Sequence, residues 1–348
     1  MKQFTKRGLA LLLALVMSLS FTLTIAAEDY VDFAKEVYNL NMSFGNDPKT
    51  SRNFAFTAKA KYNRMVVRYA PAGVDFETNY QETRGRIMAS DFNAEGTAAT
   101  CHYYKVDITG LMPGTEYVYR IGDTDEKMWS RDYRFTTAGE TEDEFTFIAM
   151  TDPQGSEASS YTLLGETIQM AMKENPRFMI TAGDMVDDSS NLTQWKWYFD
   201  AIRFATVKIP TMGVVGNHET VGELNAVSEF SRFFNHPSNG GKKAIAGLTA
   251  DMVSMPISKG VIMNIEETIY SFDYGDAHIV VLNTGSDGYT DDCAIPLLEA
   301  QQKWLEEDLK NTKAKWKFIF MHQGMYPAKA ERYFGMRRVL EETVHKYG

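Results

Sequence analysis

Residues 178–188 read FMITAGDMVDD and join a short apolar run to three closely spaced aspartates. The run is typical of a buried strand, and Gly183 permits a tight turn directly after it. Ligands of α/β sheets bind beyond the carboxyl ends of the strands, so Asp184 is expected to point into such a crevice. Asp184, Asp187 and Asp188 repel one another unless a cation neutralises them. The stretch therefore indicates a cation site or, alternatively, an acidic surface turn, because Asp is common in turns.

Three further apolar runs also end in side chains that can bind a metal. The run at 145–151 ends in Asp152, the run at 211–215 leads into Gly216-Asn217-His218-Glu219, and the run at 317–321 ends in His322. The stretch 178–188 does not fit the pattern of an EF-hand, because the Asp spacing is wrong and no Gly and terminal Glu follow at the required positions. We expect Asp152, Asp184, Asn217 and His322 to converge on one pocket.

Length and charge limit the classes of protein to consider. A chain of 348 residues suggests about two domains. Its formal net charge of -10 argues against a nucleic-acid surface and against docking to anionic membranes. A phosphate substrate stays possible, since metal ions supply local positive charge whatever the chain total. The two cysteines, Cys101 and Cys293, fall in different predicted domains, so no disulfide framework is expected.

Residues 1–27 have the pattern of a secretory signal peptide. Lys2, Lys6 and Arg7 precede an apolar stretch at 9–21, and small residues follow at 26–27. The alternative is a membrane anchor, but the apolar stretch is short for a span and no charged stop-transfer cluster follows it. The sequence predicts a secreted, extracellular protein with no stable membrane span in its mature form.

The first half of the remaining chain predicts an all-β sandwich over residues 41–138. Short runs in which apolar and polar residues alternate are separated by turn residues. The stretch 111–117 is similar to the tyrosine corner of fibronectin type III modules, with Tyr117 as the tyrosine. Residues 139–144 are small, polar and acidic, as in a linker. The alternating runs are 53–57, 64–69, 102–108 and 117–121.

Beyond the linker, residues 145–348 alternate strand-like runs with helical segments and predict an α/β domain. A helix over 161–173 would place Leu163, Leu164, Ile168 and Met172 on one side. Further helices are predicted over 193–204 and 297–311, and two strands over 269–273 and 277–282. His278 alternates with apolar neighbours and is read as structural. Residues 236–264 read as a long loop, either a lid or a passive excursion.

The ordered strand-end motifs resemble those of the calcineurin-like metallophosphoesterases, and with the preceding sandwich the chain is similar to purple acid phosphatases from about residue 41 onward. This resemblance implies a four-layer αββα fold for the second domain. It also implies two metal ions (Fe, Zn, Mn or Mg) and a phosphate-ester substrate. The motifs that carry it are Asp152-Pro153-Gln154, Gly183-Asp184-Met185-Val186-Asp187, Gly216-Asn217-His218-Glu219, the 270–275 hairpin, Gln302-Lys303-Trp304-Leu305 and His322.

By this resemblance, Asp184 would bridge the two ions, Asp152 would bind the first, and Asn217 and His322 would bind the second. His218 would face the phosphate and stabilise it or protonate the leaving oxygen. A metal-bound hydroxide would then attack phosphorus in line. The resemblance thus implies a secreted acid phosphatase of phosphomonoesters.

Three positions depart from the family pattern. Asp187 stands where purple acid phosphatases carry the tyrosine that colours their ferric iron, so we expect a colourless protein. Gln154 stands where many relatives have a histidine ligand, and its amide oxygen could ligate or only hydrogen-bond. Asp187 could likewise ligate or not. The third departure is a Gly-His-x-His turn that this sequence lacks, so we expect a C-terminally incomplete domain that binds metals weakly. His345, in the last residues, is read as a surface helix residue.

Two other functions stay open. A phosphodiesterase or nucleotidase would share these motifs, since loops such as 220–264 set the choice of substrate. A non-catalytic, surface-binding protein with a degenerate phosphoesterase domain is also compatible with the changes at Gln154 and Asp187.

Overall fold

The structure is a computed structural model that describes residues 36–92, 99–142, 144–220, 227–246, 265–284, 291–326 and 334–347. The predicted signal peptide and most of the predicted 236–264 loop lie outside these ranges, as does the side chain of Cys293. Within them, no helix combines the length and the apolar character needed to span a membrane.

The N-terminal domain consists of two antiparallel sheets whose alternating apolar residues face each other. All four predicted runs are strands, and the first strand begins at Val37 rather than at about residue 41. One sheet has the order β1-β2-β6-β5 (Val37–Ser43, Ser51–Ala58, Ala99–Thr109, Arg86–Phe92). The other has the order β4-β3-β7-β8 (Gln81–Arg84, Met65–Pro71, Glu116–Asp123, Met128–Trp129), and β9 (Tyr133–Thr136) also pairs with β7.

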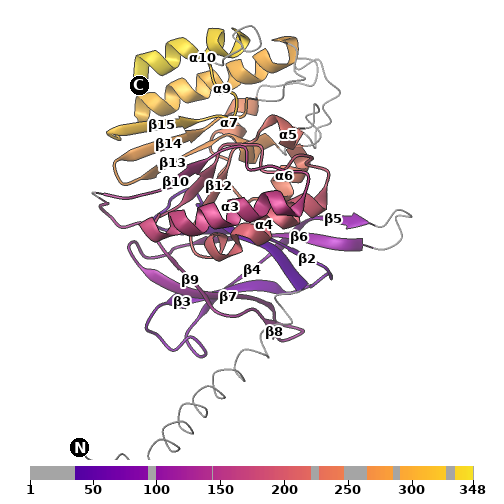
Figure 1. Cartoon of the computed structure of the whole chain (residues 1–348). Coiled ribbons are helices and arrows are strands. Elements are labelled where there is room, and N and C mark those ends of the chain that lie inside the picture. The colour runs from indigo at the N-terminus through magenta and orange to yellow at the C-terminus, as the bar shows by residue number, and fades with distance from the viewer. Residues whose placement is uncertain are drawn as a thin grey trace, which may run out of the picture.

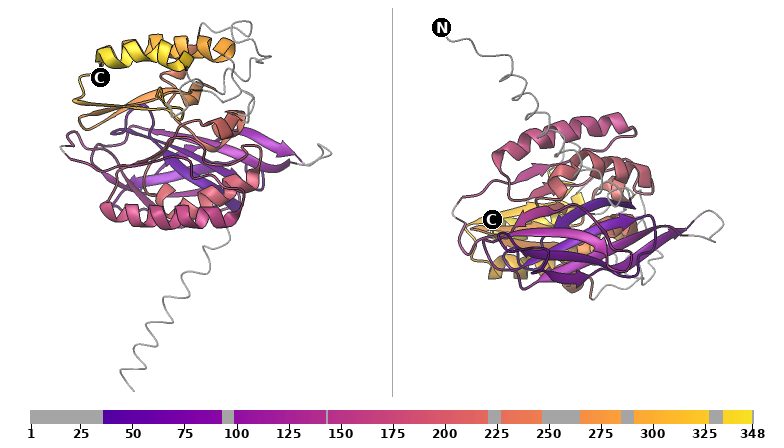
Figure 2. Two further views of the ribbon diagram at one scale, coloured as in Figure 1. Left: turned by 45° about the horizontal axis from the view of Figure 1, so that its top comes forward. Right: turned by 90° about the horizontal axis from the view of Figure 1, so that it is seen from below.

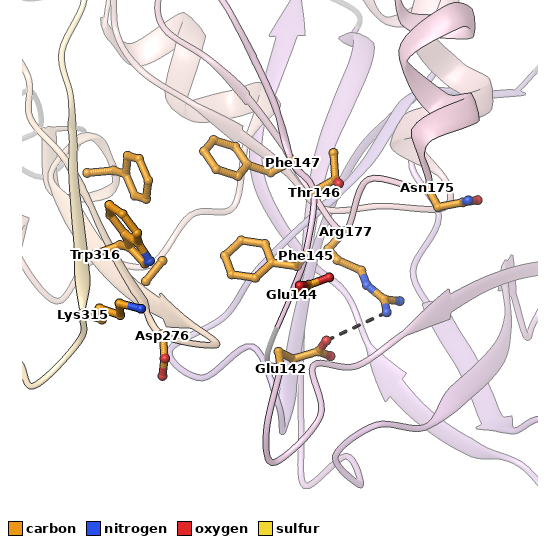
Figure 3. A pocket seen from close by; sticks show the side chains of 12 residues that line it. Glu142, Glu144, Phe145, Thr146, Phe147, Asn175, Arg177, Asp276, Lys315 and Trp316 are labelled. Atoms are coloured by element: carbon orange, nitrogen blue, oxygen red, sulfur yellow. Dashed lines mark ion pairs between the residues drawn. The ribbon is translucent and has the colours of Figure 1, made fainter.

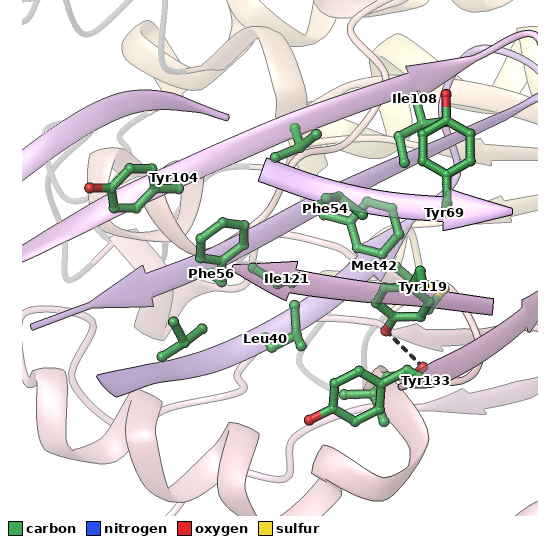
Figure 4. Close-up of a cluster of buried hydrophobic side chains, with 14 of the residues drawn as sticks. Leu40, Met42, Phe54, Phe56, Tyr69, Tyr104, Ile108, Tyr119, Ile121 and Tyr133 are labelled. Atoms are coloured by element: carbon green, nitrogen blue, oxygen red, sulfur yellow. Dashed lines mark hydrogen bonds between the residues drawn. The ribbon is translucent and has the colours of Figure 1, made fainter. Parts of the chain in front are cut away.

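Aromatic rings fill the space between the two sheets (Figure 4). Phe56 stacks on Tyr104 with ring centroids 5.4 Å apart, and Phe54 contacts Tyr119. The hydroxyl of Tyr117 accepts a hydrogen bond from the backbone N–H of Met112 at 2.9 Å, as the tyrosine corner predicts. Cys101, in this domain, is a buried free cysteine.

The C-terminal domain contains two three-stranded sheets. In the first, β10, β11 and β12 (Ile148–Met150, Met179–Thr181, Thr211–Gly213) are all parallel. In the second, β13 (Tyr270–Tyr274) is antiparallel to β14 (Ala277–Val281), and β15 (Trp316–Phe320) is parallel to β14. The helices are α3 (Ala158–Ala171), α4 (Leu192–Thr206), α5 (Asn217–Thr220), α6 (Val227–Phe233), α7 (Gly241–Ile245), α9 (Asp291–Asn311) and α10 (Phe334–Tyr347), and short 3₁₀ turns lie at Met172–Glu174 and Glu266–Thr268.

Three apolar clusters hold these elements together in the order seen in Figure 1. Residues of α3 and α4 pack against the first sheet, the two sheets pack on each other, and α9 and α10 pack against the second sheet. Phe178, directly before β11, lies in the cluster between the two sheets. Its ring centroid is 5.6 Å from that of Phe272 in β13. A sheet-rich domain followed by an α/β domain is the arrangement that the sequence predicts.

One part of the helix prediction is wrong. Leu163 is 69% exposed, whereas Leu164 and Ile168 are buried together with Tyr161. Residues three and four apart share a helix face, so the buried stripe of α3 runs through 161, 164 and 168 and excludes 163. The helices predicted over 193–204 and 297–311 are present as α4 and α9, with Trp195, Tyr198 and Phe199 buried in α4, and Leu298, Leu305 and Leu309 buried in α9.

The two domains share a buried interface of apolar contacts and hydrogen bonds, while the β5–β6 hairpin extends past the rest of the molecule (Figures 1 and 2). Asn235, which follows α6, donates to the carbonyl oxygens of Phe54 and Val106 and to the Asp107 carboxylate, all in the sandwich. The hydroxyl of Tyr119 donates to the carbonyl oxygen of Val207 at 2.9 Å. These bonds connect strands of the sandwich to the segments beside β12, one of the strands that lead to the candidate site.

His278 is a structural residue, as the sequence indicates. It lies on β14 with its side chain 6% exposed, between Asp273 of β13 and Asp308 of α9. Its Nδ1 is 2.6 Å from Asp273 Oδ1, and its Nε2 is 2.8 Å from Asp308 Oδ2. Burial lowers the pKa of His278, but the hydrogen bonds and charges of the two carboxylates outweigh burial and raise it to about 9.

This raised pKa predicts pH-dependent stability. The pKa is about 9 in the folded chain and 6.5 ordinarily, so the contribution is complete below pH 6.5 and is lost as pH rises through 9. Relative to a His278→Asn variant, the wild-type free energy of unfolding should fall by about 3 kcal/mol over that window, because one pKa unit corresponds to about 1.4 kcal/mol. Urea unfolding of both proteins from pH 6 to pH 10 measures this. Parallel curves for the two proteins would contradict the assignment.

Candidate metal centre at the strand ends

Four strands deliver the predicted ligands to one edge of the C-terminal domain. Asp152 follows β10, Asp184 follows β11, Asn217 begins α5 after β12, and His322 follows β15. Met150, Thr181 and Gly213 are in register at the ends of the three parallel strands, so the segments that follow start at one level. The common direction of the strands thus brings together side chains from positions 152 to 322.

The side chains of Asp152, Asp184 and His322 form a compact cluster. One ligand atom from each lies within 4.8 Å of the other two. His322 Nε2 is 3.2 Å from Asp184 Oδ2 and 2.9 Å from Asn217 Oδ1. The predicted convergence of Asp152, Asp184, Asn217 and His322 is therefore present in the structure.

The backbone adopts unusual conformations at both aspartates. Asp152 has φ 54° and Asp184 has φ 55°, in the left-handed region that costs a non-glycine residue about 1–2 kcal/mol. Asp152 N–H donates to the Gly183 carbonyl oxygen at 3.1 Å, and Gln154 N–H donates to the Asp184 carbonyl oxygen at 3.0 Å. These two bonds, both donated by the Asp152 loop, hold the two loops together, and strained residues of this kind concentrate at functional sites.

The charges at the centre depend on one another. Burial alone would raise the pKa of Asp184, but the hydrogen bonds from His322 and from the His218 backbone, with the charges of both imidazoles, lower it below its ordinary value. Burial lowers the pKa of His322, and the hydrogen bond and charge of Asp184 more than compensate and raise it to about 9. Asp184 thus stays ionised and attracts positive charge, either a proton on His322 or a cation in its place.

His218 lies at the rim of the cluster, with its side chain 34% exposed. Its Nδ1 is 2.6 Å from the carbonyl oxygen of Asp187, which only accepts hydrogen bonds, so we place a proton on Nδ1. Its Nε2 is 3.9 Å from Asp184 Oδ2 and is turned toward the cluster. Burial lowers the pKa of His218, while the Asp187 carbonyl and the charges of Asp184 and Asp187 raise it to a net value above the ordinary one.

The other two predicted ligands lie beside the cluster. The Asp187 carboxylate is 45% exposed, and its Oδ1 is 3.6 Å from His218 Nδ1. The Gln154 amide satisfies its surroundings when its nitrogen donates to the carbonyl oxygens of Asp184 at 2.6 Å and Asp152 at 3.2 Å. The other amide position, then the oxygen, is 3.4 Å from Asp184 Oδ2. Two oxygens at this distance repel unless a cation lies beside both.

Gly216 and Glu219, to which the sequence assigns no separate role, determine how the Asp184 loop packs. Glu219 is completely buried and accepts backbone hydrogen bonds from Asp184, Met185 and Gly216. Gly216 has no room for a side chain, because a Cβ there would lie 2.1 Å from Asp184 Oδ1. Both residues belong to the quoted Gly-Asn-His-Glu segment, but their contacts reach residues more than 30 positions away and leave no local signal.

A separate hollow of about 990 Å³ opens at the opposite ends of the strands (Figure 3). Phe145, Phe147, Arg177 and Trp316 line it, and each precedes or begins a strand. None of the predicted ligands borders it. Because ligands of α/β sheets bind at the carboxyl ends of strands, we assign the chemistry to the Asp184 cluster and not to this hollow.

The donor set of the cluster suits a divalent or trivalent cation. Carboxylate and amide oxygens with an imidazole nitrogen are ligands of Fe, Mn and Zn, and the oxygens also suit Mg. Their spacing within 4.8 Å allows one ion to contact several of them. The residues present therefore fit a metal centre.

Comparison with known proteins gives the class. Residues 37–137 match the family described as "Purple acid Phosphatase, N-terminal domain", and residues 145–348 match "Calcineurin-like phosphoesterase". The second match covers more than half of the chain, so the chain belongs to the calcineurin-like phosphoesterases. With the first match, it is a purple-acid-phosphatase-like member of that family.

Individual relatives agree with this assignment. The chain is 24% identical over 335 residues to "Purple acid phosphatase 23" of Arabidopsis thaliana, which covers 86% of this chain and 64% of the relative. It is 25% identical over 292 residues to "Acid phosphatase type 7" of Mus musculus, covering 74% and 58%. The chain thus spans less than two thirds of the length of these relatives.

A solved structure shows the same fold. Purple acid phosphatase PPD1 from yellow lupin (Lupinus luteus) seeds superimposes with a TM-score of 0.60 at 17% identity. The superposition covers 81% of this chain and 50% of the lupin chain. At this identity, the likeness supports the fold alone.

The tight packing of the centre predicts a strong effect of Gly183→Ala. Gly183 has φ 90°, and a Cβ there would lie 2.6 Å from His322 Nδ1. The positive φ and the contact together should lower the free energy of unfolding by about 2–4 kcal/mol in chemical denaturation. Gly324→Ala is the matched control, since a Cβ at Gly324 meets no atom within 4 Å. Equal losses in the two variants would contradict the geometry described.

Proposed function

We propose that this protein is a secreted, metal-dependent phosphatase that hydrolyses phosphomonoesters. The observation that carries the proposal is the convergence of Asp152, Asp184, Asn217 and His322 from four strand ends. Family membership supports the same chemistry, and the basic-then-apolar pattern of residues 1–27 supports export.

In this proposal the centre holds two metal ions. By the family resemblance, Asp184 would help to hold both ions, Asp152 would help to hold the first, and Asn217 and His322 would help to hold the second. When bound, such ions supply the nucleophile and withdraw negative charge from the phosphoryl oxygens. His322 must then bind through a neutral imidazole, so Nε2 gives up its proton while Nδ1 keeps its bond to the Ala182 carbonyl oxygen at 2.9 Å.

His218 is proposed as the catalytic acid. The Asp187 carbonyl accepts from Nδ1 and so fixes the ring, which leaves Nε2 directed toward the cluster. A protonated Nε2 can donate to a phosphate oxygen and pass its proton to the leaving oxygen. The hydrogen bond to the Asp187 carbonyl oxygen helps to raise the pKa of His218 and so favours the protonated ring that an acid requires.

Gln154 and Asp187 complete the proposed ligand set. The favoured orientation of the Gln154 amide directs its oxygen toward Asp184 Oδ2, which supports ligation by that oxygen. Asp187 stands close to His218 and is half exposed, so its carboxylate can reach a cation only from the open side of the site. Neither residue supplies a phenolate, and the proposed enzyme is colourless.

Asp184→Asn tests the proposal most simply. Loss of the bridging carboxylate should reduce hydrolysis of p-nitrophenyl phosphate on the order of a thousandfold, since metal ions contribute several kcal/mol to such reactions. The same variant should lose any rise in melting temperature caused by Mn²⁺. Asp188→Asn is the control, because the Asp188 carboxylate accepts from Ser190 and lies outside the cluster. Full hydrolysis by Asp184→Asn would overturn the proposal and favour a non-catalytic role for the cluster.

The substrate class has a separate test. A phosphomonoesterase should hydrolyse p-nitrophenyl phosphate faster than bis(p-nitrophenyl) phosphate when both are measured with Mn²⁺, Zn²⁺ or Fe³⁺. The opposite ranking would replace the proposed activity with a phosphodiesterase on the same centre.

A further inference from the structure

Glu219 is the most deeply buried acidic side chain beside the candidate centre. It follows Asn217 and His218 in α5, its exposed fraction is 0%, and its carboxylate faces the loop that carries Asp184. Oε2 accepts from the N–H of Gly216 at 2.7 Å and of Asp184 at 2.8 Å, and Oε1 accepts from the N–H of Met185 at 2.7 Å. Three backbone donors thus bind one carboxylate that has no contact with solvent.

The Asp184 loop presents successive backbone N–H groups to one carboxylate, as an anion-binding nest does to its anion. Gly183 and Asp184 have consecutive positive φ angles of 90° and 55°, and the N–H groups of Asp184 and Met185 both point to the same carboxylate. In other proteins such concave loops bind phosphate or other anions. Here Glu219 fills the nest, so this loop binds part of the chain itself.

This arrangement connects the two strand ends that carry the proposed bridging and amide ligands. Glu219 attaches the loop after β11 to the turn after β12, and the N–H of His218 donates back to Asp184 Oδ1 at 3.0 Å. Three backbone hydrogen bonds to one side chain can together offset the cost of the left-handed Asp184. The direction of the Asp184 carboxylate therefore depends on Glu219.

We propose that Glu219 is a positioning residue of the metal centre, which fixes Asp184 for metal binding and touches neither metal nor substrate. The inference rests on the proposed metal-dependent function and adds a residue to it. Because Glu219 acts on Asp184 through the backbone, its loss should weaken metal binding more than it weakens folding.

The test compares Glu219→Gln with Glu267→Gln in the full chain. Glu267 is a partly buried glutamate that pairs with the buried Lys105 of the sandwich, and none of its described bonds reaches the Asp184 loop. Mn²⁺ affinity is measured by titration calorimetry, and stability is measured by urea unfolding in EDTA. Glu219→Gln should raise the Mn²⁺ dissociation constant at least about tenfold, as changes behind metal ligands do, whereas Glu267→Gln should lose stability with unchanged affinity.

The outcomes separate this inference from the function beneath it. Wild-type protein that binds no Mn²⁺, Zn²⁺ or Fe³⁺ overturns both proposals. Wild-type protein that binds metal, with equal affinity in Glu219→Gln, overturns the positioning role alone.

A measurement on the wild type covers the case in which Glu219→Gln does not fold. The amide hydrogens of Asp184 and Met185 should exchange slowly with solvent in EDTA, because each donates to a buried carboxylate. The exposed amide of Ser190, bonded to the partly exposed Asp188, should exchange faster and serves as the internal reference. If the Asp184 and Met185 amides exchanged at the rate of the Ser190 amide, their hydrogen bonds to Glu219 would be excluded.

Discussion

The structure depends on holding carboxylates close together against their mutual repulsion. Parallel strands in register bring Asp152 and Asp184 to one edge, where a ligand atom of each lies within 4.8 Å of the other. Asp184 is only 3% exposed, so water screens its charge poorly and a positive partner is needed. His322 provides one through Nε2, and the amide oxygen of Asn217 adds negative potential beside it. The centre is therefore arranged to bind a cation.

The surrounding residues can be understood from this requirement. Gly183 and Gly216 leave space for the His322 ring and for the Asp184 carboxylate. Asp152 and Asp184 occupy left-handed conformations that few side chains tolerate, and bonds between the loops keep them there. The sandwich domain contributes at a distance, because its bonds to Asn235 and Val207 fix the segments on either side of β12.

Much of this could be predicted from the sequence, because strand ends are local features. An apolar run followed by Gly-Asp, Asp-Pro or Gly-Asn-His marks a strand and the side chain beyond it. Because parallel strands run in the same direction, these side chains then lie at the same edge of the sheet. Glu219, Asn235 and the Lys105–Glu267 pair could not be predicted in this way. Their partners lie far along the chain, and a single buried Glu or Asn has no periodicity to read. The prediction that Leu163 lies on the apolar side of its helix was wrong for a different reason. A helix face is narrow, and a shift of one residue changes whether a side chain is buried.

The central claim is that Asp152, Asp184, Asn217 and His322 hold metal. The most direct measurement is anomalous X-ray diffraction from crystals of the protein grown with Mn²⁺, recorded on both sides of the manganese absorption edge. The account predicts an anomalous peak within coordination distance of Asp184 and His322 that is absent below the edge. A fully ordered site with no peak at saturating Mn²⁺, or a peak only at a distant surface position, would contradict it.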